Sequence, residues 1–302
     1  MSSQSVDYKS ILTGFVAIIG PPNVGKSTLL NRLVGTKVAI VSRKPQTTRN
    51  RILGILNGEE VQIVFLDTPG IHQTRSPLHE SMVASAHAAI SEVDSILFMI
   101  EMSHSDESDI RLTLKNIKAS KKPCLLVVNK IDKGPRGQLL PLMDAFKRVH
   151  PFRAIIPISA RYGDGVEELL KELKTCLEPG PRFFPSDMKT DQSEPFLVSE
   201  IIREKIYAFS RRELPYATAV TVEQIEDVPQ KDLVRIYAKI HVERDSQKAI
   251  MIGQGGKMMK AIGRSARLAL EDFLGVRVFL DLVVRVEKNW SKDPKALRRL
   301  GY

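Results

Sequence analysis

The chain has few of the residues that crosslink a protein or bind transition metals. Its 302 residues include two cysteines, Cys124 and Cys176, and six histidines that lack zinc-ligand spacing. We therefore expect no disulfide framework, and Cys124, inside an apolar run, is expected to be a buried thiol. The apolar runs are only strand-length, well short of the ~18 residues of a membrane-spanning helix.

Targeting signals are also missing. The first seven residues, MSSQSVD, contain neither an apolar signal core nor an arginine-rich transit pattern, so we expect a cytoplasmic protein. The length is enough for two domains. The net charge of +10 is uneven, because residues 235–302 carry 15 Lys+Arg and 7 Asp+Glu, whereas residues 181–234 carry 7 and 10. The basic end is typical of a protein that binds a polyanion, either RNA or a membrane surface.

One run near the N-terminus fits the phosphate-loop pattern G-x-x-x-x-G-K-[ST]. Its residues, together with the next one, are Gly20, Pro21, Pro22, Asn23, Val24, Gly25, Lys26, Ser27 and Thr28. A strand-like stretch precedes the run and a helix-like stretch follows it, which favours a nucleotide site over an ordinary Gly/Pro turn. Backbone amides would surround the phosphates, Lys26 would reach the β- and γ-phosphates, and Ser27 would ligate Mg²⁺.

A second motif selects the base. The residues Asn129, Lys130, Ile131 and Asp132 follow the apolar run 124–128. The Asp132 carboxylate can accept hydrogen bonds from the guanine N1–H and 2-amino groups, and adenine offers no such pair, so GTP and GDP are the expected ligands. Lys130 would lie along the base and support the phosphate loop. Ser159 and Ala160 follow the strand-like run 155–158 and would bring a backbone N–H to the guanine O6.

The residues between these motifs are expected to carry out hydrolysis. Asp67, Thr68, Pro69 and Gly70 end the strand-like run 61–66. Asp67 would hold Mg²⁺ through a water, and the Gly70 N–H would meet the γ-phosphate. Upstream, Thr48 is the favoured second Mg²⁺ ligand, with Thr47 as the alternative. Loss of the γ-phosphate would release both segments.

Ile71 occupies the position where Ras-type GTPases place a water-orienting glutamine. Because its side chain neither donates nor accepts a hydrogen bond, we expect slow intrinsic turnover. The catalytic set is then Lys26, Thr48, Asp67 and Gly70, and Ile71 completes the nucleotide site without taking part in the chemistry.

The composition changes around residue 182. We expect a nucleotide domain over 1–182, a polar linker over 183–194 and a second domain over 195–302. In the second domain, helical periodicity covers residues 195–212, residues 218–222 are strand-like, and alternation predicts strands at 234–242 and 276–286. A further helix over 258–273 is capped by Gly275. The order is helix–strand–strand–helix–helix–strand.

The two central helices of this domain are separated by a GXXG sequence. Its residues are Gly253, Gln254, Gly255 and Gly256. In KH domains this loop lets the backbone approach single-stranded nucleotides, although a glycine-rich turn between helices would have the same sequence. Ile250 and Ile252 would line the base-binding groove, belong to the core, or do both. Lys257, Lys260 and Arg264 would supply positive charge to the RNA backbone.

Taken together, the chain resembles the Era family of bacterial GTPases over nearly its whole length. The resemblance rests on the segments GPPNVGKSTLLN, SRKPQTTRNRI, DTPG, NKID and IGQGG and on the C-terminal tail NWSKDPKALRRLGY. It implies an α/β P-loop NTPase domain of the Ras-like type with a mostly parallel sheet, joined to an α+β type II KH domain.

The resemblance also implies a function. Era proteins bind the 3′ end of 16S rRNA, assist late assembly of the 30S subunit and associate peripherally with the inner membrane, and GTP favours their RNA binding. By the same likeness Asn23 would support a K⁺ ion, and we expect a monomer with no small-molecule substrate besides GTP. Gln254 departs from the usual lysine of the KH loop, so we expect weaker salt dependence rather than loss of RNA binding.

Three other functions remain as alternatives. A GTPase of tRNA modification or large-subunit assembly would share only the nucleotide domain, which the GXXG domain argues against. A membrane-surface GTPase would use the basic tail to bind anionic lipid. An RNA-binding protein with an inactive nucleotide site is disfavoured, because the phosphate and guanine motifs are intact.

Overall fold

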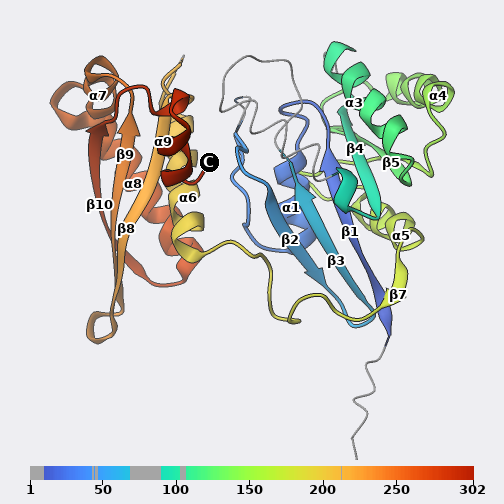
Figure 1. Cartoon of the computed structure of the whole chain (residues 1–302), viewed down its shortest axis with the longest axis horizontal. Coiled ribbons are helices and arrows are strands. Elements are labelled where there is room, and N and C mark those ends of the chain that lie inside the picture. Colours follow the sequence, from blue (N-terminus) through green and yellow to red (C-terminus); the bar gives the residue numbers. More distant parts are fainter. Residues whose placement is uncertain (1–9, 43, 45–46, 69–89, 103–106, 212) are drawn as a thin grey trace, which may run out of the picture. The chain divides into compact units, whose positions relative to one another are not determined.

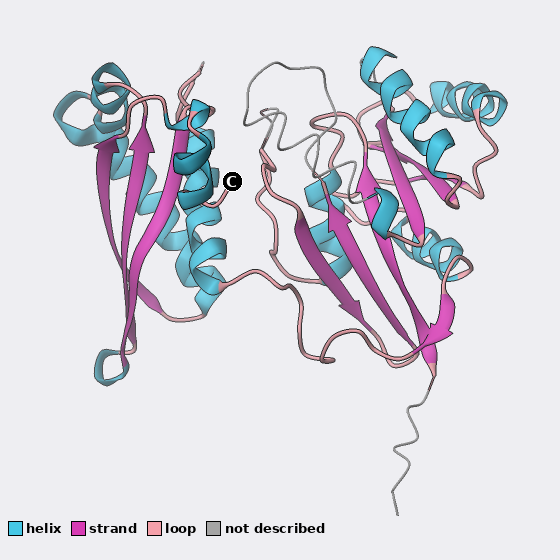
Figure 2. Ribbon diagram, viewed as in Figure 1, coloured by secondary structure: helices cyan, strands magenta, loops and turns pink. Residues whose placement is uncertain are grey.

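The computed structural model describes residues 10–42, 44, 47–68, 90–102, 107–211 and 213–302. These fall into two compact units. The first comprises 10–38, 51–68, 90–102 and 107–191. The second comprises the described residues within Ala39–Asn50 and within Gln192–Tyr302. Figure 1 names the elements and Figure 2 distinguishes helices from strands.

The first unit is a sheet with helices. Its elements are β1 (Ile11–Ile19), α1 (Lys26–Val34), β2 (Ile52–Asn57), β3 (Val61–Asp67), β4 (Ser95–Glu101), α3 (Glu107–Ser120), β5 (Cys124–Asn129), α4 (Leu139–Val149), β6 (Ile155–Pro157), α5 (Val166–Lys174) and β7 (Glu178–Gly180). The strand order is β2-β3-β1-β4-β5-β6. The pairs from β3 through β1, β4 and β5 to β6 are parallel, whereas β2 is antiparallel to β3.

This sheet is buried on both faces, as expected for a parallel sheet whose connections are helices. One face packs against α3 through residues such as Leu114 and Ile117. The opposite face packs against α1. There, a Cβ on Gly54 of β2 would lie 2.6 Å from Leu30 Cδ1, so this glycine allows the helix to approach closely.

The parallel pairing brings the carboxyl ends of β1, β3, β5 and β6 to one edge of the sheet. The phosphate loop follows β1, Asp67 ends β3, Asn129 ends β5, and Ser159 comes shortly after β6. The fold therefore gathers motifs that lie more than a hundred residues apart in the sequence.

The second unit has the predicted element order. Its elements are α6 (Glu194–Phe209), β8 (Thr218–Val228), β9 (Leu233–Val242), α7 (Asp245–Ile252), α8 (Lys257–Leu274), β10 (Arg277–Val286) and α9 (Pro294–Arg299). The sheet order is β10-β9-β8, with β9 and β10 parallel and β8 antiparallel to β9. Helices α6 and α8 pack against it in one apolar core that includes Ile202, Ile236 and Ile262.

Two details differ from the predictions. Helix α6 ends at Phe209 rather than at residue 212, because Ser210 takes up an extended conformation and its hydroxyl donates back to the Ile206 carbonyl. Phe209, which helical spacing placed on the apolar face, is 41% exposed. Residues 178–180, at the end of the predicted nucleotide domain, form β7 and pair with β1.

The division of the chain also differs in one segment. The change of unit falls at 191/192, inside the predicted linker, but Ala39–Asn50 is grouped with the second unit rather than with the nucleotide domain. The reason is a set of long-range hydrogen bonds from this segment to α6 and to the chain around β8, none of which a local pattern encodes.

Within the described residues, none of the helices combines the length and the apolar character needed to cross a bilayer.

Candidate functional site

The phosphate loop connects β1 to α1 by a backbone path that requires glycine. Gly25 precedes the helix with φ 105°, a left-handed conformation that other residues rarely adopt. A Cβ at Gly25 would also lie 2.3 Å from the Asn129 side-chain nitrogen. Glycine here therefore lets Asn129 approach the loop closely. The loop leads into the N-terminus of α1, where free backbone N–H groups favour negative charge.

Lys26 is buried within this loop. Its Nζ donates to the carbonyls of Gly20 at 3.0 Å and Pro21 at 2.9 Å. Burial lowers the pKa of Lys26 to about 8, and the nearby Asp67 carboxylate opposes this only in part. The ammonium group is thus held by neutral carbonyls in an environment that disfavours its charge, and a bound phosphate would supply the missing negative partner.

Ser27 and Asp67 form the candidate metal site. The Ser27 hydroxyl donates to Asp67 Oδ2 at 2.7 Å, and Asp67 is fully buried at the end of β3. Both groups are oxygen donors, which Mg²⁺ prefers, and both lie beside the phosphate loop, so they fit the ion. The Thr68 hydroxyl donates to the Ile18 carbonyl and fixes the chain where it leaves β3.

Two groups of predicted residues are not part of this geometry. Pro69, Gly70 and Ile71 lie outside the described residues. Thr47 and Thr48 belong to the second unit, where Thr48 is 8% exposed. Their roles at the metal and the γ-phosphate stay predictions.

On the guanine side, Asn129 joins the two loops of the site. Its Nδ2 donates to the Val24 carbonyl at 2.7 Å, and its Oδ1 accepts from the Ala160 N–H at 2.9 Å. Asn129 thus supports the phosphate loop. Lys130 forms an ion pair with Glu101, and its predicted place along the base stays a prediction. The Ala160 N–H, one candidate donor for the guanine O6, is already engaged by Asn129.

The loop after β6, residues 159–161, is called the selectivity loop, and hydrogen bonds hold it in place. The Ser159 hydroxyl donates to Asp132 Oδ1 at 2.8 Å, which orients the carboxylate that we predict to read guanine. Ile131 packs against the apolar core, and its predicted place in the guanine site stays a prediction. Sequence reasoning missed Arg32 of α1, whose Nε donates to the Ala160 carbonyl at 2.7 Å and which also donates to the Arg161 carbonyl.

In the second unit, the GXXG loop lies between α7 and α8. Gly253 has φ 74°, and a Cβ there would lie 2.7 Å from Met258 Cβ, so glycine is required. Gly255 and Gly256 also have positive φ, but open space surrounds them, and the Gln254 side chain is exposed. This leaves the backbone accessible to a large ligand.

The two isoleucines before the loop are not core residues. Ile250 is 54% exposed and Ile252 is 38% exposed, whereas Met251 between them is fully buried. The interpretation of these isoleucines as core is therefore wrong, because helix α7 turns them toward solvent. Two apolar side chains at the mouth of a glycine loop form a surface on which bases can pack.

Next to this loop lies a basic open pocket of about 580 Å³. It is lined by Phe209, Lys257, Lys260, Ala261, Arg264, Ser265 and Leu268. Three of these residues are the predicted RNA-binding cations, all of them exposed along one side of α8. Phe209 adds an exposed ring that we had not assigned to this surface.

Two family models match the chain. One, described as a 50S ribosome-binding GTPase, covers residues 15–130, and the other, described as a KH domain, covers residues 213–291. Full-length relatives decide the family. The GTPase Era of Syntrophus aciditrophicus is 48% identical over 99% of this chain and 96% of its own length. The GTPase Era of Geobacter metallireducens is 50% identical over 96% and 97%. The chain belongs to the Era family of GTPases.

Solved Era structures agree with this assignment. A single-site variant of Aquifex aeolicus Era bound to GDP·AlF4⁻ matches with a TM-score of 0.93 at 43% identity. Era in complex with MgGDPNP and nucleotides 1506–1542 of 16S rRNA matches with 0.92 at 43%. Each match covers 97% of this chain and 99% of the other. Like its Era relatives, the chain is a GTPase with a P-loop domain and a C-terminal KH domain.

Proposed function

We propose that this Era-family GTPase binds the 3′ end of 16S rRNA through its KH domain and acts in late assembly of the 30S subunit. The GXXG loop carries the proposal, because its open backbone, exposed isoleucines and adjacent cations match the requirements of single-stranded RNA. The rRNA complex of a relative that is 43% identical supports the choice of RNA. The bound nucleotide, GTP or GDP, gates this binding.

For the nucleotide site, we propose that residues 20–28 surround the phosphates and that Asp132 reads guanine. Mg²⁺ is held by Ser27, by Thr48 and, through a water, by Asp67, with the Gly70 N–H at the γ-phosphate. When bound, the metal neutralises charge on the phosphate oxygens. Lys26 then exchanges its carbonyl partners for phosphate oxygens and balances the charge that develops during transfer.

Turnover without a partner is slow, because Ile71 offers no group to orient water. We propose a K⁺ ion beside Asn23, whose side chain is exposed on the phosphate loop. Turnover should then be faster in KCl than in NaCl at equal ionic strength. Equal rates would contradict the K⁺ site and leave the remaining assignments untouched.

The gating is tested with a short RNA that ends in the 3′ sequence of 16S rRNA. RNA affinity should be higher with a non-hydrolysable GTP analogue than with GDP, and by linkage RNA should tighten GTP binding. Equal RNA affinity in both nucleotide states would refute the gating. The salt dependence of RNA binding should be shallower for this chain than for its Gln254→Lys variant, because the added lysine neutralises one more phosphate.

A second role, peripheral association of this cytoplasmic monomer with the inner membrane, has its own supporting observation. Phe209 and Leu268 are exposed apolar side chains beside Lys257, Lys260 and Arg264, a combination that suits an anionic lipid surface. Sedimentation with phosphatidylglycerol vesicles should carry the protein down, and excess 16S 3′-end RNA should displace it. No sedimentation would leave RNA as the ligand of this surface.

A further inference from the structure

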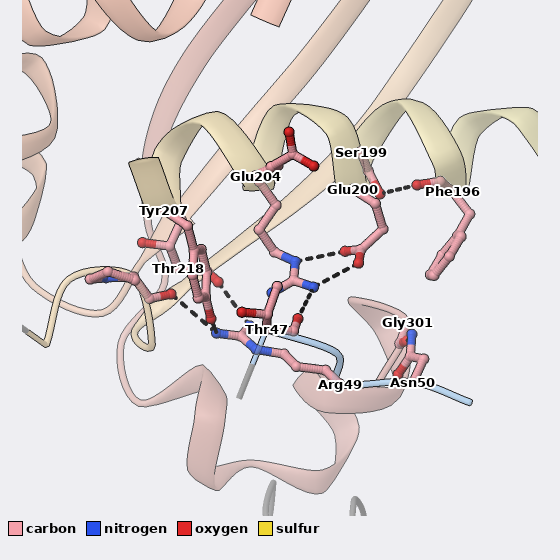
Figure 3. Close-up of polar contacts among 12 residues, drawn as sticks. Thr47, Arg49, Asn50, Phe196, Ser199, Glu200, Glu204, Tyr207, Thr218 and Gly301 are labelled. Carbon is pink, nitrogen blue, oxygen red and sulfur yellow. Dashed lines mark hydrogen bonds and ion pairs between the residues drawn. The ribbon is translucent and has the colours of Figure 1, made fainter. Parts of the chain in front are cut away.

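The segment of residues 47–50, which carries the predicted metal ligand Thr48, is anchored to the KH-containing unit (Figure 3). On one side of Thr48, the Thr47 carbonyl accepts from Arg203 Nη2 at 2.6 Å. On the other side, Asn50 Nδ2 donates to the Gly301 carbonyl at 2.6 Å. The backbone is thus fixed both before and after Thr48.

Arg49 is the main anchor. It is 5% exposed, and its guanidinium donates to an unusual set of acceptors, all of them neutral. The acceptors are the carbonyls of Thr218 at 2.9 Å, Pro215 at 3.1 Å and Tyr216 at 2.9 Å, and the Tyr207 hydroxyl at 3.2 Å. A planar group with five fixed donors suits such a site, whereas a lysine could not reach all of these acceptors at once.

The C-terminal tail completes the Arg49 site. The guanidinium carbon lies 5.1 Å from the ring centre of Tyr302 and 5.8 Å from that of Trp290, within the range of cation–π attraction. The two rings stack on each other with centroids 5.7 Å apart. Trp290 is fully buried, and its Nε1 donates to the Ala217 carbonyl. The last residues of the chain therefore hold a segment near its beginning.

Arg203 is itself fixed before it binds the segment. Its Nε and Nη2 donate to the two oxygens of Glu200 at 2.6 Å, one turn earlier on α6, in a bidentate pair. Its guanidinium also lies over the Tyr207 ring at 5.3 Å. The Thr47 carbonyl is thus bound to a rigid donor on a buried helix face.

We propose that Arg49 and Arg203 are positioning residues for GTP hydrolysis, with Trp290 and Tyr302 as their support. This rests on the proposed role of Thr48 as a metal ligand. By anchoring both sides of Thr48, the two arginines order the ligand in advance, so that less entropy is lost when the GTP-bound metal recruits it. In this proposal the anchors in the KH-containing unit act on hydrolysis through Thr48 alone.

The test compares variants of the full chain. Arg49→Ala removes the anchor, Arg49→Lys keeps the charge but loses the planar fork, and Tyr302→Ala is paired with Tyr302→Phe, which keeps the ring. The control is Arg51→Ala, two residues from Arg49, which loses only a surface ion pair with Glu92 in the first unit. For each variant, GTP turnover as a function of Mg²⁺ concentration, GDP affinity and thermal unfolding are measured.

We expect Arg49→Ala to lower kcat by up to about 100-fold and to raise the half-saturating Mg²⁺ concentration, because the ligand is no longer held in place. GDP affinity should stay unchanged, because Thr48 is needed only when the γ-phosphate is present. Arg49→Lys and Tyr302→Ala should fall between Arg49→Ala and the native protein. Tyr302→Phe and Arg51→Ala should behave like the native protein.

Unchanged kcat and Mg²⁺ dependence in a folded Arg49→Ala protein would overturn the proposal, as would equal losses of GDP affinity and kcat. If Arg49→Ala does not fold, Tyr302→Ala decides by the same criteria. Thr48→Ala separates the two levels of inference. Normal turnover in Thr48→Ala would refute the metal ligand itself, whereas loss there with normal Arg49 and Tyr302 variants would refute only the positioning role.

Discussion

Lys26 and Arg49 are both buried cations held by backbone carbonyls, and they differ in where those carbonyls come from. The partners of Lys26, Gly20 and Pro21, lie six and five residues away, respectively, in the same loop. The partners of Arg49 lie 158–169 residues away, around α6 and β8. A short motif is enough to form the first site, whereas the second requires the folded KH unit.

The side chains of Lys26 and Arg49 also differ in how firmly they keep their carbonyl partners. Burial lowers the pKa of Lys26 to about 8, so its charge is weakly held and its carbonyl partners can be exchanged for phosphate. The guanidinium of Arg49 is a planar fork that binds several carbonyls at once. The lysine site suits a ligand that comes and goes, and the arginine site suits a permanent attachment.

The sharpest test of this contrast is Lys26→Ala. We expect GTP affinity to fall by about 3–6 kcal/mol, roughly 10²–10⁴-fold, because two charge-assisted phosphate contacts are lost. Thermal stability of the nucleotide-free protein should hardly change, because the loss of two hydrogen bonds to the carbonyls of Gly20 and Pro21 is offset by the removal of a desolvated cation. Isothermal titration and a melting curve measure both quantities. A large drop in melting temperature would make Lys26 structural and remove the contrast.

Arg203→Met tests a buried cation whose expected role is to stabilise the fold rather than to bind a ligand. We expect a loss of about 3–5 kcal/mol in unfolding free energy, because Glu200 is left buried without its partner. The double variant Arg203→Met/Glu200→Leu should recover much of this loss, which urea unfolding can measure. A double variant as unstable as the single one would show that packing, rather than the uncompensated charge, causes the effect.

Arg32→Ala should have a smaller effect on the guanine side. Loss of its hydrogen bonds to the carbonyls of Ala160 and Arg161 should weaken GDP binding by about 2 kcal/mol, roughly 30-fold, because the selectivity loop loses its support. Lys171→Ala on α5 is the control, because it removes only surface ion pairs with Glu167 and Glu168. Equal GDP affinity in both variants would contradict the supporting role of Arg32.

The smallest expected effect is a pH dependence that arises from Lys26. Above pH about 8 the Lys26 ammonium of the nucleotide-free protein loses its proton, and phosphate binding requires that the proton be restored. GTP affinity should therefore fall about tenfold between pH ~7 and ~9. Over the window from about 8 to 10.5 the unfolded chain binds more protons at this residue than the folded one. Stability without nucleotide should therefore rise with pH.

Both trends come from one group and can be measured by titration and by denaturant unfolding. In Lys26→Arg the charge persists, so neither GTP affinity nor stability should show this pH dependence, provided that the variant still binds nucleotide. A flat pH profile of GTP affinity in the native protein would contradict the lowered pKa.

The same contrast explains how much could be predicted from the sequence. The strand–loop–helix at Gly25, the alternation of β9 and the glycine cap at Gly275 were predictable, because each depends on residues that are close in the chain. The grouping of Ala39–Asn50 with the KH unit was not predictable, because it depends on carbonyls of distant residues, which carry no side-chain signature.

The site itself shows the same limit. The motif residues of the phosphate and guanine loops were identified, and the Ser27–Asp67 hydrogen bond joins two of them. The bridging role of Asn129 and the support from Arg32 required the sheet topology. The exposure of Ile250 and Ile252 depended on the rotation of α7, which a helix of eight residues with apolar residues on several sides does not specify.

The position of Trp290 and Tyr302 has a consequence for the order of events during translation. Trp290 and Tyr302 lie 241 and 253 residues after Arg49, so the ribosome makes them long after Arg49. A nascent chain can complete its phosphate loop early, but Arg49 cannot contact rings that have not yet been synthesised. A growing copy of this GTPase therefore lacks the aromatic part of the Arg49 site until both rings have been made.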